Sequence, residues 1–150
     1  MAYLKSENHG DALTLNGFRL ELNGKPIETI YKVGGLSQTT GEIEWVDGQT
    51  GIAEVFTDQK INSGPLTLAY RVDPTNTEFS QMDQLVQASQ RNGTRFNFVI
   101  VKYNHGIEVF RIPVYAAVFK GKTLPELNKN ESGPFDVELE VPCAYWEILR

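Results

Sequence analysis

The stretch FNFVIVKYNHGIEVFRIPVYAAVF, residues 96–119, decides the fold class. Two runs rich in Val, Ile, Tyr and Phe, at 96–103 and 107–119, flank the short segment Asn104-His105-Gly106. Strand-forming runs on both sides of a Gly-containing turn predict one long β-hairpin. Pro113 lies in the second run, and its missing N–H favours an edge, a bulge or a bend at that point.

Further strands are predicted by an alternation of large apolar residues with small or polar ones. The alternation occurs at 18–22 and 66–72, and again at 135–141, where every second residue is acidic. This period of two is typical of strands that bury one face. Turn signals containing Gly separate the runs along the whole chain. The sequence therefore predicts a mainly β, antiparallel domain.

One segment has helical spacing instead. Its apolar and small residues recur at intervals of three and four: Phe79, Met82, Leu85, Val86 and Ser89. Asn92-Gly93 follows as a stop signal. We expect one amphipathic helix at about residues 77–91, with a polar face made mostly of Gln side chains.

Length and composition predict a single domain over residues 1–150. The chain has a mass of 16.9 kDa. Its content of 41% hydrophobic and 22% charged residues is ordinary for a globular protein. Its net charge of −5 argues against sequence-independent binding to nucleic acid or to anionic membranes. No apolar run approaches the roughly 18 residues of a membrane span, and residues 1–10 lack a signal-peptide pattern. The lone Cys143 also fits synthesis in a reducing cytoplasm.

Candidate catalytic residues are few. The two histidines, His9 and His105, lie in the N-terminal segment and in the hairpin turn, and Cys143 follows Pro142 in an apolar stretch. None of these positions predicts a nucleophile beside a base, and no spacing typical of a zinc or calcium site is present. The sequence favours a structural or binding protein over an enzyme, with no catalytic residue, cofactor or metal.

Residues 47–64 are expected to form a long polar loop. The segment carries isolated apolar residues that a monomer cannot easily bury: Ile52, Val55, Phe56 and Ile61. Long loops in small domains are commonly functional. We therefore expect this loop to become ordered on assembly.

The order of features between residues 15 and 71 resembles that of a known family. A hairpin at 18–27 leads to VGGLS at 33–37, then to EIEWVDG at 42–48, and finally to GPLTLAYR at 64–71. This order is similar to that of the tail tube proteins of contractile-tailed bacteriophages, which are related to the tube proteins of type VI secretion systems and R-type bacteriocins. Gly34 replaces a common Ser, and 60–64 departs from the usual Lys-x-Pro-Gly. The helix and the run 137–148 also suit the family, so the resemblance covers most of the chain.

The resemblance implies an antiparallel β-sandwich or half-barrel with one flanking α-helix. Six such subunits close into a ring whose inner strands form one continuous β-barrel, and the rings stack into a tube that conducts DNA into the host. Residues 1–11 are then an N-terminal arm, and the loop at 47–64, through its four apolar residues, is the candidate inter-ring contact. The implied partners are further copies of the chain, the tail sheath, baseplate or initiator proteins and the tail terminator. The implied location is the virion tail, assembled in the host cytoplasm.

The excess of acidic over basic residues suits a tube that conducts DNA, because a negatively charged wall does not bind the phosphates of the DNA that passes through it. Same-face spacing makes several acidic residues candidates for the lumen. They are Glu42, Glu44, Glu108, Asp136, Glu138 and Glu140.

Two alternatives remain open. The same tube could belong to a type VI secretion system or to a bacteriocin-like contractile particle. A stand-alone β module that binds a small ligand or carbohydrate is the rival from another class. Its candidate stacking platforms are Trp45, Tyr70, Tyr103 and Trp146.

Overall fold

The computed structural model describes residues 13, 15–46, 48–49, 51–72, 75 and 78–150. The expected N-terminal arm at 1–11 lies outside these residues. The elements are β1 (Phe18–Leu22), β2 (Lys25–Ile27), β3 (Ile30–Gly34), β4 (Gln38–Val46), β5 (Ala53–Ser63), β6 (Leu66–Arg71), α1 (Glu78–Asn92), β7 (Phe96–Asn104), β8 (Ile107–Ala117), β9 (Gly121–Thr123), β10 (Asp136–Val141) and β11 (Tyr145–Trp146).

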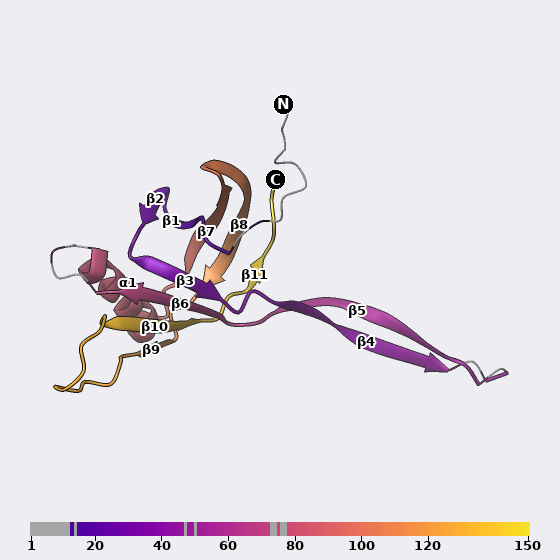
Figure 1. Ribbon diagram of the computed structural model, residues 1–150. Helices are drawn as coiled ribbons and strands as arrows, with labels where there is room; N and C mark the ends of the chain where they lie inside the picture. Colours follow the sequence, from indigo (N-terminus) through magenta and orange to yellow (C-terminus); the bar gives the residue numbers. More distant parts are fainter. Residues whose placement is uncertain (1–12, 14, 47, 50, 73–74, 76–77) are drawn as a thin grey trace, which may run out of the picture.

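Two antiparallel sheets form the body of the molecule (Figure 1). The five-stranded sheet has the order β11-β8-β7-β1-β2, and the four-stranded sheet has the order β3-β6-β10-β9. The predicted hairpin is confirmed as β7 and β8, and its turn places both His105 and Gly106 at positive φ, as tight hairpin turns require. The strand order leaves β3 and β9 as the two edges of the four-stranded sheet.

The core lies between the two sheets and α1. The four-stranded sheet contributes Leu68 and Leu139, the five-stranded sheet contributes Phe98, and α1 contributes Met82 and Val86, all of them buried. The mainly β sandwich with one flanking helix is thereby confirmed. The helix ends where the sequence predicts, because Gly93 takes a positive φ and donates its N–H to the Ser89 carbonyl. Among the described residues, no helix is long and apolar enough to cross a membrane.

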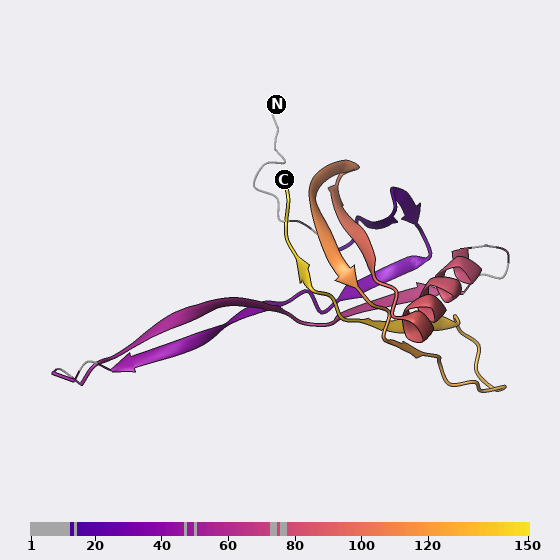
Figure 2. The ribbon, with the colours of Figure 1, turned by 180° about the vertical axis from the view of Figure 1, so that it is seen from behind.

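Strands β4 and β5 leave the body as a long two-stranded hairpin, which we call the arm (residues 38–63). Figures 1 and 2 show it projecting from one end of the sandwich, far beyond both sheets. The prediction of a loop at 47–64 is wrong, since β5 occupies Ala53–Ser63 and pairs with β4 along its length. The cause is that the described side chains of both arm strands are almost all exposed, so no buried face imposes a period of two on β5.

Candidate assembly surfaces

One face of the four-stranded sheet packs on the core, and the other, which we call the outer face, carries most of its charge. Register shows which side chains share the outer face: Arg71 lies opposite Asp136, Ala69 opposite Glu138, and Thr67 opposite Glu140. Lys32 of β3 lies beside Ala69. The intervening residues, such as Leu68 and Leu139, point to the core. The outer face is therefore a polar surface backed by a fully packed layer.

Tyr31, Arg71 and Asp136 form a hydrogen-bonded cluster at one end of this outer face. The guanidinium of Arg71 donates to both carboxylate oxygens of Asp136, from Nε at 2.9 Å and from Nη2 at 3.3 Å. The hydroxyl of Tyr31 donates to the same carboxylate at 2.9 Å, and Arg71 lies 4.9 Å from the centre of the Tyr31 ring. The hydrogen bonds from Arg71 lower the pKa of Asp136, and the hydrogen bond to Asp136 raises the pKa of Tyr31. The cluster ties β3, β6 and β10 together.

We expect Asp136→Asn to lower the pKa of Tyr31 towards its ordinary value of 10.0, because the neutral amide no longer disfavours the tyrosinate. An NMR pH titration of the Tyr31 ring measures this. An unchanged Tyr31 titration would contradict the cluster.

Because the pKa of Asp136 is lowered on folding, its ion pair contributes stability above the ordinary Asp pKa of about 3.9, and the contribution is lost as pH falls through the folded-state value.

The arm has two chemically different faces. Ile43 lies opposite Phe56, and Trp45 lies opposite Glu54, so these four residues form what we call the aromatic face. Trp45 is 58%, Ile43 55% and Phe56 52% exposed. Three large apolar side chains that stay exposed on one projecting surface are typical of an interaction site.

The opposite side of the arm, the acidic face, carries Glu42 and Glu44. Their cross-strand neighbours are Thr57 and Val55. Near the body, the register shifts between Thr40 and Glu42, so three residues of β5 oppose Gly41, and Gln59 takes a positive φ there. The bulge separates the outer part of the arm from its base.

Known proteins resemble this chain in fold and not in overall sequence. No model of a protein family matches the sequence, and no curated protein matches it. Solved structures do. A chain of the sheath-tube complex of PVC, an extracellular contractile injection system, superposes with a TM-score of 0.80 at 16% identity, over 97% of this chain and 98% of that chain. This chain has the fold of contractile-tail tube proteins.

Two further structures share the tube-protein fold. A chain of the PVC sheath/tube terminator in the extended state matches with a TM-score of 0.79 and 18% identity, over 93% of this chain and 98% of that one. A chain of the anti-feeding prophage baseplate, described as 6-fold symmetrised, matches with a TM-score of 0.72 and 18% identity, over 93% of this chain and 97% of that one.

On the tube-protein fold, the six acidic lumen candidates separate into three places. Asp136, Glu138 and Glu140 share the outer face, as their spacing predicts. Glu42 and Glu44 lie on the arm, and Glu108 lies on the five-stranded sheet, where Arg111 donates to it at 2.7 Å. The hydrogen bond from Arg111 lowers the pKa of Glu108.

The outer face is also less acidic than the sequence of β10 alone suggests. Arg71 and Lys32 come from neighbouring strands, and Lys120 lies 4.0 Å from Glu140. Sequence reasoning missed these cations because strand pairing, which no local pattern reveals, brings them beside the carboxylates.

The four candidate inter-ring residues all lie exposed on the arm, but not on one face. Phe56 belongs to the aromatic face and Val55 to the acidic face. Ile52 precedes β5, and Ile61 lies near the base, opposite Thr40. Sequence reasoning missed Ile43 and Trp45, although their alternation with Glu42 and Glu44 was a usable strand signal.

The aromatic residues of the rival ligand-binding hypothesis do not form one platform. Tyr70 is buried in the core, and burial raises its pKa to about 12. Tyr103 is covered by the guanidinium of Arg19, 5.2 Å from the ring centre, whereas Trp45 lies out on the arm. Trp146 is half-buried in β11. Within the described part of the chain, no group of three or more His, Cys, Asp or Glu side chains could hold a metal ion.

Proposed function

We propose that this protein is the repeating structural subunit of the inner tube of a contractile, tail-like particle, and that it has no catalytic role. The observation that carries the proposal is the match of nearly the whole chain to a chain of a sheath-tube complex. Two features of the isolated molecule support it independently. These are the open edges of the four-stranded sheet and the exposed aromatic face of the arm.

In the proposed ring, β3 of one copy lies beside β9 of the next, so that the four-stranded sheets continue into one barrel. Open edges present unpaired N–H and C=O groups, and closure satisfies them. The outer face then lines the lumen, because the opposite face is already occupied by the core. Six copies per ring follow the symmetry described for the anti-feeding prophage baseplate.

Stacking of the rings uses the arm. A head-to-tail contact repeats without closing and so generates a filament. The arm projects from one end of the body and carries apolar side chains that only another molecule can cover. The proposed inter-ring contact therefore includes Ile43 and Trp45 of β4, which lie outside the 47–64 segment.

The proposed cargo is viral DNA that passes through without specific binding. The outer face sets three carboxylates against Arg71 and Lys32, so six copies do not build the strongly cationic wall that would retain a polyanion. The tail sheath, a baseplate or initiator and a tail terminator are the proposed partners. The particle is a virion tail assembled in the host cytoplasm. The second candidate is the tube of a bacteriocin-like particle, which the similarity to contractile injection systems favours.

The proposal is tested by the mass of the purified protein across a concentration series, measured by analytical ultracentrifugation. We expect a species of six times 16.9 kDa that gives way to larger, polydisperse assemblies as concentration rises. Addition of a tail initiator complex is the second condition, because a nucleus can be required for polymerisation. A 16.9 kDa monomer under both conditions would contradict the proposal.

If the parent particle is a phage, reversal of the outer-face charge will slow genome ejection. Glu138→Lys combined with Glu140→Lys adds two cations per copy to the proposed lumen. Each added contact with a DNA phosphate strengthens binding through counterion release, so the DNA should move more slowly. Ejection kinetics in vitro measure the effect, which should weaken as salt is raised. The matched pair Glu138→Gln and Glu140→Gln should slow ejection less. Wild-type kinetics in the Lys variant would remove this face from the lumen.

A further inference from the structure

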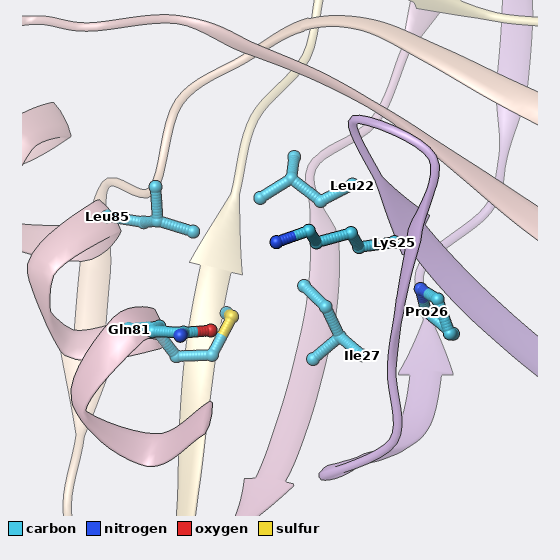
Figure 3. A pocket seen from close by; sticks show the side chains of 7 residues that line it. Leu22, Lys25, Pro26, Ile27, Gln81 and Leu85 are labelled. Atoms are coloured by element: carbon cyan, nitrogen blue, oxygen red, sulfur yellow. The ribbon is translucent and has the colours of Figure 1, made fainter. Parts of the chain in front are cut away.

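A small apolar groove lies between the β1–β2 turn and α1 (Figure 3). Its cavity measures about 100 Å³. The lining residues are Leu22, Lys25, Pro26, Ile27, Gln81, Met82 and Leu85. Figure 3 shows the amino group of Lys25 lying among Leu22, Ile27 and the side chains of α1, so the groove combines an apolar floor with one cation.

Lys25 makes no ion pair with any residue that the structure describes. Two carboxylates of the elements that line the groove, Asp83 of α1 and Glu21 of β1, are paired elsewhere, with Lys122 and Arg19 respectively. A cation that borders an apolar surface favours a ligand with an apolar body and a carboxylate, since the charge-assisted contact adds to the apolar one.

The elements that line the groove, β2 and α1, lie at the end of the body opposite the arm, as both ribbon views show. A head-to-tail stack requires a donating and an accepting surface at opposite ends of one subunit. The nine residues of β4 extend over about 30 Å, enough to carry the outer arm away from its own body and onto a neighbouring copy.

The aromatic face of the arm combines apolar side chains with a carboxylate, which is the combination that the groove favours. It presents Ile43, Trp45 and Phe56 with one carboxylate, Glu54, which lies directly opposite Trp45. We propose that the groove receives one apolar side chain from the aromatic face of the arm of a second copy in the adjacent ring, with Glu54 of that copy paired to Lys25. This inference rests on the proposed tube function and assigns the acceptor of its inter-ring contact.

Charge exchange between the two surfaces tests the assignment. We expect Lys25→Glu and Glu54→Lys each to lower the fraction of rings found in tubes by about tenfold, because each leaves like charges facing in the contact. Combining both changes in one chain should restore the wild-type fraction, while rings form throughout. Lys129→Glu, an exposed charge reversal in the 124–135 segment, is the matched control and should stack normally. Electron microscopy counts rings and tubes.

Normal stacking of Lys25→Glu, or failure of the combined variant to regain tubes, would overturn the assignment while the proposed function stands. Absence of both rings and tubes in the wild type would overturn both. Crosslinking gives a second measurement: Lys25→Cys with Glu54→Cys, in a Cys143→Ser background, should yield a ladder of disulfide-linked oligomers when assembled tubes are oxidised. Each single cysteine should yield no ladder beyond a dimer, and a double variant without a ladder contradicts the contact.

Discussion

Replacing Ile43, Trp45 and Phe56 together with serine will abolish the stacking of rings into tubes and leave the subunit folded. The three side chains are about half exposed and lie on the arm, outside the core between the sheets. Their loss should therefore shift the melting temperature by no more than about 2 °C. In a stacked tube, large apolar side chains buried at a contact typically cost about 2 kcal/mol or more each when truncated.

Electron microscopy and thermal unfolding of the same preparation measure both parts of this prediction. The control is the acidic face of the same arm, with Glu42, Glu44 and Thr57 replaced by serine. That variant should retain stacking, because it removes no apolar side chain from the contact. Tubes formed by the aromatic-face variant at wild-type concentration would show that the arm does not join the rings.

Leu139→Ala will destabilise the subunit by about 3 kcal/mol, through lost burial and the cavity that remains. Leu139 is 1% exposed in the centre of β10, opposite the equally buried Leu68. For a domain of this size the melting temperature should fall by roughly 6–12 °C. Urea unfolding gives the free energy directly. Glu138→Gln, an exposed neighbour on the same strand, should change it by less than about 0.5 kcal/mol, and a comparable loss there would contradict the assigned faces of β10.

The elements that the sequence predicts are those with one buried face. The hairpin of β7 and β8, strand β10 and helix α1 each show the period that burial imposes, and each lies within a few residues of its expected position. The arm is the exception. From the sequence, strand β5 is expected to be a polar loop because its apolar side chains stay exposed, so no buried face imposes a period of two.

The assembly surfaces are predictable only in part, for a related reason. The carboxylates of β10 share a face because alternation along one strand fixes it, but Arg71 and Lys32 reach that face through pairing between distant strands. The groove is likewise built from the β1–β2 turn and α1, which are distant in the sequence. Surfaces that join separate segments carry no local pattern, so they become visible only once the fold is known.

We propose that this chain builds a hollow tube whose lumen is lined by the outer face of the four-stranded sheet. Electron microscopy of the purified protein across a concentration series, followed by reconstruction of any assembly, tests it most directly. We expect six-fold rings and stacked tubes, in which the side chains of Arg71, Glu138 and Glu140 face the central channel and the arms of each ring contact the next ring. Tubes with the four-stranded sheet turned outward, or a monomer at every concentration with and without an initiator complex, would contradict it.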